Sequence, residues 1–278
     1  MPTSAYEGKA WTNLCLDAIN AVKPVTNVLD IGCGEGTYSN LFRSTIGRTW
    51  IGIEIFEPYI QKYELHLKYD HVHTTDVRKF DVQDGQWDVV FCGDVLEHMH
   101  RREALSLCES LLASGATVFV SVPIIPFPQG SVDGNDHEAH LDQWTHAEAL
   151  SELPDVVAHQ KGNVVGVYVL SRQAAVIEAL RTYSGGDDTL KLALQSADAR
   201  PWLILAHQYY EAQSWCDCYF AARKATSLPN DEPNRSYMYL SLACWNTDMK
   251  AEARRHAMTA LMASPTDKLL QDNLRFML

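Results

Sequence analysis

The spacing of hydrophobic and polar positions changes along the chain. Through residues 25–170, short apolar runs rich in Val and Ile alternate with stretches whose apolar residues recur three or four positions apart. The first kind of run is typical of strands buried in a sheet, and the second spacing is typical of helices that cover one. After residue 183 only the helical spacing continues. The pattern therefore predicts an α/β region followed by an all-α region.

Seven strands are expected in the α/β region. Five runs separated by helical stretches predict parallel strands at residues 25–31, 49–55, 71–75, 87–92 and 116–122. The helical stretches lie at 38–44, 58–67 and 101–113, and the last stops just before Gly115. Two further runs, at 155–159 and 164–170, are joined by a turn too short for a crossover helix, so we expect them to be antiparallel. The sequence thus predicts a doubly wound, mostly parallel seven-stranded sheet.

The C-terminal region repeats itself at a spacing of 35 residues. Large and small residues recur in register between two sets, which are Trp202, Leu205, Ala206, Tyr209, Cys218, Ala222, Ala225 and Tyr237, Leu240, Ser241, Cys244, Ala253, Ala257, Ala260. Two packed antiparallel helices need this alternation, and the pattern resembles tetratricopeptide repeats. We place an α/β domain at residues 1–183 and a helical domain at 189–278. We expect the helical tail to pack on the α/β domain or another subunit, where it could bind a protein partner or self-associate.

Composition and charge exclude several classes of function. The 278-residue chain carries a formal net charge of −12. Residues 1–198 sum to −13, and residues 199–278 sum to +1. This charge opposes binding to nucleic acid or to anionic lipid. No apolar run approaches the roughly 18 residues of a membrane helix, and the N-terminus lacks the features of a secretory signal. The seven cysteines form no CxxC pair, so we expect reduced thiols and a cytoplasmic protein.

A glycine-rich turn follows the first predicted strand. The strand contains Asp30 and runs into Gly32, Gly34 and Gly36 before a helix begins. Glycines let the backbone approach a ligand, and the start of a helix offers free N–H donors. Glu54 follows 18 residues after Gly36 at the end of the second strand, where a carboxylate can accept hydrogen bonds from both hydroxyls of a ribose. The spacing therefore predicts a nucleotide-like ligand.

Two more strand ends carry polar residues. The third predicted strand ends at Asp76, where a carboxylate could meet an exocyclic amine. The fourth is followed by Asp94 and then by the Leu-Glu-His sequence that ends at His98. Because carboxyl ends of parallel strands meet at one edge of a sheet, we expect these groups to surround the same ligand.

Taken together, the segments DIGCGEG, GIEI, TTD and DVVFCGDVLEHM resemble the class I S-adenosylmethionine-dependent methyltransferases. They most resemble a branch with Leu-Glu-His after the fourth strand, which includes many small-molecule O-methyltransferases, and the resemblance covers residues 1–170. It implies S-adenosylmethionine as the cofactor and S-adenosylhomocysteine as the product. It also implies that Asp30, Gly32, Gly34, Gly36 and Asp94 lie near the methionine moiety, Glu54 on the ribose and Asp76 by the adenine.

Histidines are the candidates for acceptor chemistry. An alcohol must lose a proton when it is methylated, and histidine is the usual base near neutral pH. The candidates are His98 after the fourth strand, and His137 and His140 in a polar insert at 123–145 that we expect to act as a lid. The insert's carboxylates and imidazoles could instead hold a divalent metal, although they lack the spacing of a known metal motif. We assign no metal ligand from the sequence.

These observations leave several functions open. The first is methyl transfer to a small-molecule or glycan-like acceptor, most simply at oxygen. The second is a catalytically silent scaffold whose helical tail binds a protein partner; against it, the glycine turn, Glu54 and Asp76 are intact. Methylation of nucleic acid conflicts with the acidic charge and with the absence of an Asn/Asp-Pro-Pro-Tyr/Phe sequence after the fourth strand.

Overall fold

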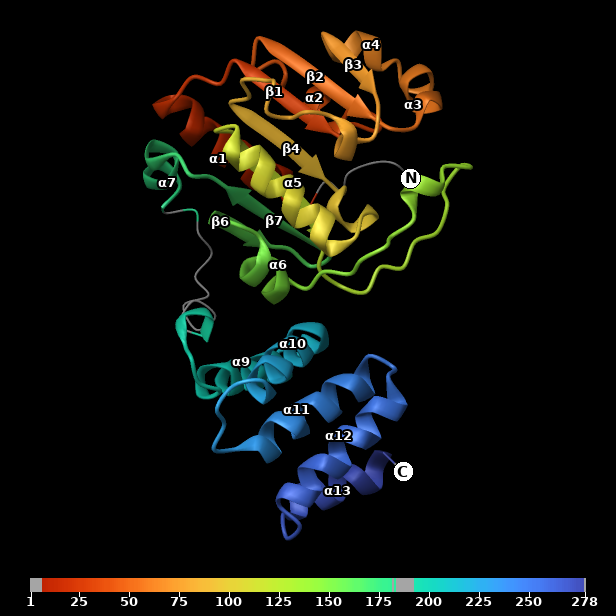
Figure 1. Ribbon diagram of the computed structural model, residues 1–278, viewed down its shortest axis with the longest axis vertical. Helices are drawn as coiled ribbons and strands as arrows, with labels where there is room; N and C mark the ends of the chain where they lie inside the picture. Colours follow the sequence, from red (N-terminus) through yellow and green to blue (C-terminus); the bar gives the residue numbers. More distant parts are fainter. Residues whose placement is uncertain (1–6, 182, 184–192, 278) are drawn as a thin grey trace. The chain divides into compact units, whose positions relative to one another are not determined.

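The computed structural model describes residues 7–181, 183 and 193–277. A seven-stranded sheet with the strand order β3-β2-β1-β4-β5-β7-β6 forms the centre of the first part (Figure 1). The strands are β1 Asn27–Ile31, β2 Thr49–Glu54, β3 His71–Thr74, β4 Val89–Gly93, β5 Thr117–Pro123, β6 Val156–Lys161 and β7 Val165–Leu170. Neighbours from β3 to β5 are parallel, whereas β7 runs antiparallel to both β5 and β6. The predicted fold class is confirmed, including the antiparallel final pair.

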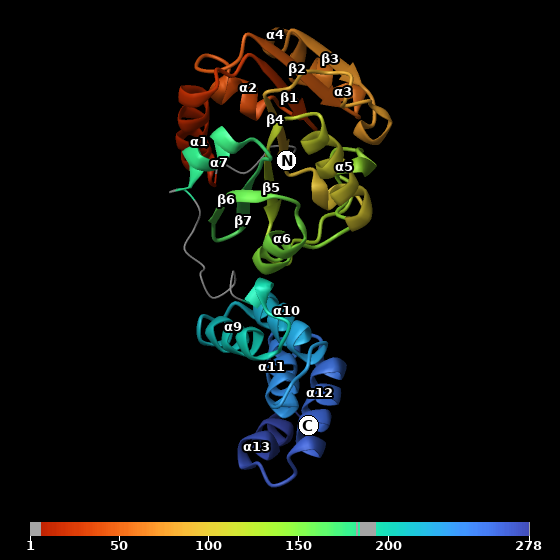
Figure 2. The ribbon, with the colours of Figure 1, turned by 60° about the vertical axis from the view of Figure 1, so that its left-hand side comes forward.

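Helices cover both faces of this sheet. They are α1 Lys9–Val22, α2 Thr37–Phe42, α3 Glu57–Lys62, α4 Leu65–Lys68, α5 Arg101–Ala113 and α7 Ala174–Leu180. Apolar residues of α1, α2 and α7 pack with the strands in one core cluster, and α5 lies on the opposite face (Figure 2). The single helix expected over 58–67 is wrong: the chain forms α3 and α4, because Glu64 between them adopts a left-handed φ of 50° that no α-helix contains.

The C-terminal part consists of helices. These are α9 Arg200–Glu211, α10 Trp215–Thr226, α11 Pro233–Asn246, α12 Lys250–Ala263 and α13 Lys268–Met277. Adding 35 to the bounds of α9 and α10 reproduces those of α11 and α12 to within two residues. The small residues that recur at this spacing, such as Ala222 and Ala257 or Ala225 and Ala260, are buried. The repeat in the sequence thus corresponds to a repeat of helical pairs.

The chain divides into two compact units, and one of them combines segments that are distant in the sequence. Residues 145–151 group with the described C-terminal residues 193–277, and the other described residues form the first unit. Most of this segment is α6, His146–Glu152, whose Ala147 amide donates a 3.1 Å hydrogen bond to Asp217 Oδ1 at the start of α10. Among the helices that the structure describes, none is long and apolar enough to cross a membrane.

Candidate active site

A cavity of about 300 Å³ lies at the carboxyl ends of the parallel strands. Doubly wound sheets bind their ligands at this edge, because the loops that follow the strands leave a crevice there. The insert after β5 closes another side of the cavity with Phe127, Gln129, Asn135, Glu138 and two histidines. Of the predicted residues, the cavity wall contains Gly32, Gly34, Glu54, Asp76, Asp94, His98, His137 and His140. The fold therefore brings eight of the ten candidates to one place.

The glycine-rich turn forms the floor of the cavity. Gly32 has a φ of 64°, and a Cβ at this position would lie 2.7 Å from Val95 Cγ2, so only glycine fits. The Gly32 amide donates to the Ile53 carbonyl, and the Gly34 amide donates to Glu54 Oε2 at 2.9 Å. The turn after β1 is thereby joined to the end of β2.

Glu54 is buried in the cavity wall with 4% of its surface exposed. Its second oxygen accepts from the Phe56 amide at 2.9 Å, so the backbone fixes both carboxylate oxygens. Burial raises the pKa of this carboxyl, and the two amide donors oppose the shift. Each carboxylate oxygen can accept more than one hydrogen bond, which leaves capacity for a ligand's hydroxyls.

Asp76 and Asp94 both line the cavity. Asp76 forms an ion pair with Arg78, whose Nη2 lies 2.7 Å from Asp76 Oδ2, and this guanidinium lowers the pKa of the Asp76 carboxyl. Asp94 has a left-handed φ of 55°, and its amide donates to the Ser121 carbonyl at 2.9 Å. This backbone conformation is uncommon outside glycine, and it turns the chain out of β4 towards the next segment.

Two candidates lie outside the cavity wall. Asp30 is 1% exposed and accepts a hydrogen bond from the Tyr69 hydroxyl, whereas its other oxygen has no hydrogen-bond partner within the described part of the chain. Burial raises the pKa of Asp30 to about 7. Gly36 faces α4 instead, because a Cβ there would lie 2.7 Å from Lys68 Cδ. The structure therefore places both residues in packing contacts outside the cavity wall.

The three histidines differ in their surroundings. His98 and His140 lie with their ring centroids 4.9 Å apart, and burial lowers the pKa of each so that both are neutral at pH 7. His98 Nδ1 is 3.2 Å from the Ala139 carbonyl, and His140 Nδ1 is 2.6 Å from the Phe127 carbonyl. His137 lines the same cavity but is exposed.

Glu97 also lines the cavity, and sequence reasoning missed it. Glu97 is 1% exposed, and neither of its carboxylate oxygens has a hydrogen-bond partner among the residues that the structure describes. Burial and the neighbouring Asp94 charge raise its pKa well above the usual range. The residue stood within the Leu-Glu-His sequence, but nothing in that sequence distinguishes a buried glutamate from an exposed one.

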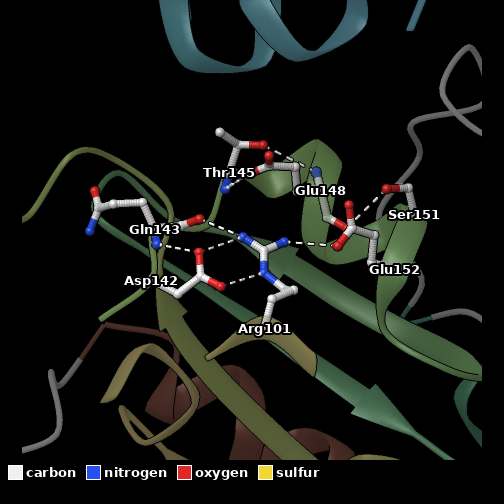
Figure 3. Close-up of polar contacts among 7 residues, drawn as sticks. All are labelled: Arg101, Asp142, Gln143, Thr145, Glu148, Ser151 and Glu152. Atoms are coloured by element: carbon white, nitrogen blue, oxygen red, sulfur yellow. Dashed lines mark hydrogen bonds and ion pairs between the residues drawn. The ribbon is translucent and has the colours of Figure 1, made fainter. Parts of the chain in front are cut away.

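Arg101 is a second residue that the sequence analysis missed. Figure 3 shows its guanidinium between Asp142 and Glu152, with Nε 3.0 Å from Asp142 Oδ2 and Nη1 2.9 Å from Glu152 Oε2. The same group lies 3.7 Å above the ring of Trp144 and donates to the Gln143 carbonyl. Arg101 thus anchors the end of the insert, a few residues after His140, to the first turn of α5.

Comparison with known proteins agrees with this architecture. The model of a family described as a methyltransferase domain matches residues 7–165, more than half of the chain. The chain therefore belongs to this methyltransferase domain family, whose members are S-adenosylmethionine-dependent enzymes.

Curated relatives match about a third of this chain. The ubiquinone biosynthesis O-methyltransferase of Acinetobacter baumannii (strain AYE) is 30% identical over 101 residues, 34% of this chain and 42% of its own length. The enzyme of the same name from Thiobacillus denitrificans is 32% identical over 101 residues, 34% of this chain and 43% of its own. The chain thus spans less than half the length of these relatives.

Solved structures also resemble the chain. The N-terminal domain of EvdMO1 with SAH bound has a TM-score of 0.43 at 16% identity, and the match covers 59% of this chain and 80% of that one. An S-adenosylmethionine-dependent methyltransferase from Clostridium acetobutylicum has a TM-score of 0.43 at 10% identity, over 59% of this chain and 92% of that one.

Proposed function

We propose that this protein transfers a methyl group from S-adenosylmethionine to a hydroxyl oxygen of a small-molecule acceptor. The observation that carries the proposal is the hydrogen bond from the Gly34 amide to Glu54, which joins the glycine turn to an acidic strand end within one cavity. A nucleoside ligand needs this pair, because its ribose hydroxyls bind a carboxylate while its tail follows the glycines.

The cofactor is assigned to residues around the turn. Glu54 would accept hydrogen bonds from the ribose. Asp76 would face the adenine, and its ion pair with Arg78 would hold the Asp76 carboxylate in place. Gly32, Gly34 and Asp94 would lie along the methionine part. Carboxylates near a positively charged sulfonium favour its binding electrostatically.

The acceptor is assigned to the side where His98 and His140 lie. In the transfer, the bond between carbon and sulfur breaks while a bond from the carbon to the acceptor oxygen forms, and sulfur keeps the electron pair. The hydroxyl proton passes to a neutral imidazole, which both histidines provide at pH 7. His137 is a third candidate for this role. The relatives named as O-methyltransferases support oxygen as the acceptor atom.

Calorimetric titration of the purified protein with S-adenosylmethionine and S-adenosylhomocysteine tests the cofactor assignment. We expect micromolar binding of both, and we expect Glu54→Gln to weaken it by roughly tenfold or more because a charged hydrogen-bond acceptor is lost. The control is Glu57→Gln, an exposed acidic residue three positions away and outside the cavity wall, which should bind as the unaltered protein does. Thermal unfolding of both variants checks their folding. No binding by the unaltered protein would favour the scaffold function instead.

We further propose that residues 189–278 form a tetratricopeptide-like domain. Its support is the agreement between the 35-residue repeat in the sequence and the bounds of α9 to α12. The buried alanines at equivalent positions allow close packing of adjacent helices, as such repeats require.

A further inference from the structure

Three side chains with metal-binding atoms meet on the acceptor side of the cavity. Glu97 and His98 belong to a short 3-10 helix, Leu96–His98, and His140 comes from the insert. One ligand atom from each of the three lies within 4.8 Å of the others. All three residues line the cavity.

The Glu97 carboxylate needs a positive partner that its surroundings do not supply. It is 1% exposed, and neither oxygen accepts a hydrogen bond from any residue that the structure describes. The charged groups that affect it are Asp94 and Glu138, which are themselves acidic. A buried carboxylate in this position must take up a proton or a cation, since isolated buried charge costs several kcal/mol.

The two histidines are oriented as metal ligands are. The Nδ1 atoms of His98 and His140 face the carbonyls of Ala139 and Phe127. Because a carbonyl only accepts hydrogen bonds, each Nδ1 carries the hydrogen, which leaves a lone pair on Nε2. Histidines that bind metals are held in this way, with one nitrogen donating to a carbonyl and the other on the metal.

The backbone fixes the distance between the two segments. The amides of Leu141 and Asp142 donate to the Glu97 carbonyl at 2.8 and 3.1 Å. Asp142 is also paired with Arg101, so the residues directly after His140 are held on both sides. The three ligand atoms are therefore positioned before any ligand arrives, which lowers the entropic cost of binding.

We propose that Glu97, His98 and His140 bind a divalent transition metal ion. Two imidazoles and one carboxylate favour Zn²⁺, Mn²⁺ or Co²⁺ over Ca²⁺, which prefers oxygen ligands alone. Three protein ligands leave coordination positions open to the cavity for water or for an oxygen of the acceptor. Binding of the acceptor to the metal rests on the proposed function, whereas binding of the metal to the three residues does not. With a metal bound, His98 and His140 serve as its ligands, and His137 is then the candidate base of the proposed function.

This site differs from the cluster of insert residues that the sequence brought into view. Asp142 pairs with Arg101, and Asp133 pairs with Lys62 at 2.9 Å, so each of these insert carboxylates already has a cationic side chain as its partner. His140 alone belongs to both sets. The insert supplies one ligand, and the other two come from the segment after β4.

Titration of the metal-free, full-length protein with Co²⁺ tests the proposal. Visible absorption reports the ligand field, and calorimetry gives the stoichiometry. We expect one equivalent to bind, and we expect Glu97→Gln and His140→Ala each to weaken binding by roughly tenfold or more, since each removes a ligand. His140→Ala is the safer variant, because that side chain is only partly buried. The control is His137→Ala, which alters the same cavity wall outside the three ligands and should bind Co²⁺ unchanged.

A titration of the same samples with S-adenosylmethionine separates this proposal from the proposed function. Absence of saturable Co²⁺ binding overturns the metal site, and so does unchanged binding by His140→Ala or equal loss in His137→Ala. If Co²⁺ binds as expected while S-adenosylmethionine does not, the metal site stands and the proposed function fails.

Discussion

A single carboxyl group beneath the glycine turn illustrates how position changes the chemistry of a residue. Asp30 lies in β1, one residue before the strand ends, and is completely enclosed. Burial penalises its charge, and the nearby carboxylate of Glu54 adds to the effect, whereas the Tyr69 hydroxyl and the Lys9 ammonium oppose it. Its pKa near 7 therefore places the charge change within the physiological range.

This shift predicts a pH dependence of stability. The folded-state pKa of Asp30 is raised above the unfolded value, so the folded protein holds an extra proton between about pH 4 and pH 7. The contribution of Asp30 to stability is complete below that window and is lost as the pH rises through it. Asp30→Asn keeps an acceptor for Tyr69 and carries no charge. Between pH 4 and pH 8, we expect the free energy of unfolding of the variant to rise by a few kcal/mol relative to that of the unaltered protein, as measured by urea unfolding.

The matched control is Asp88→Asn, because the pKa of Asp88 is lowered whereas that of Asp30 is raised. Asp88 accepts hydrogen bonds from the Thr26 and Asn27 amides and pairs with Lys23, and these contacts lower its pKa. Its contribution to stability is present above the unfolded pKa, so this variant should lose stability relative to the unaltered protein as the pH rises. If the stability of both variants changed with pH as that of the unaltered protein does, the pKa shifts assigned to Asp30 and Asp88 would be wrong.

At the scale of elements, Arg101 connects the helix after β4 to the insert that carries His140. Its side chain is 22% exposed, and the guanidinium contacts two carboxylates, a carbonyl and a tryptophan ring. Charged hydrogen bonds at such a partly buried site contribute more than they do on an open surface. Arg101 is therefore one of two attachments at the end of the insert, beside the Glu97 carbonyl that accepts from the Leu141 and Asp142 amides.

Arg101→Met should loosen the insert while preserving some of the packing on Trp144. We expect a loss of about 1–3 kcal/mol in the free energy of unfolding, because two carboxylates lose their partner. Hydrogen exchange should show faster exchange of the Leu141 and Asp142 amides that donate to Glu97. The control is Arg172→Met, which also removes a pair of carboxylate contacts but at a site that is 45% exposed. It should change both measurements much less, and an equal effect would argue against the anchoring role of Arg101.

The elements also show which features could be predicted from sequence. The bounds of α5 agree with the prediction residue for residue, because its stop signal at Gly115 is local. The break at Glu64 could not be foreseen, since glutamate has no preference for a left-handed φ. The glycine turn and Glu54 were predictable from spacing along adjacent strands. By contrast, Glu97 and Arg101 depend on contacts with residues some 40 positions away, which no local pattern encodes.

At the scale of the whole molecule, the division into units depends on a short helix. The sequence change after residue 183 marks where the strands stop, yet residues 145–151 group with the C-terminal helices. Nothing in the composition of this segment distinguishes it from a connection within the α/β region. Its membership is set by apolar packing of Ala147 and Leu150 and by the buried carboxylate of Asp217, neither of which can be read from local spacing.

Asp217 should therefore control how firmly α6 is held within its unit. The first amides of a helix have no partner inside it, and Asp217 Oδ1 accepts the hydrogen bond from one of them, Ala147. Replacing Asp217 with Ala leaves that amide unpaired in a buried site, which costs about 1–2 kcal/mol. In hydrogen exchange of the full-length protein, the Ala147 amide should exchange roughly tenfold faster or more. Asp198→Ala is the control, because Asp198 accepts from the Arg200 amide at the exposed start of α9. If both variants left Ala147 equally protected, the packing of α6 would rest on its apolar contacts alone.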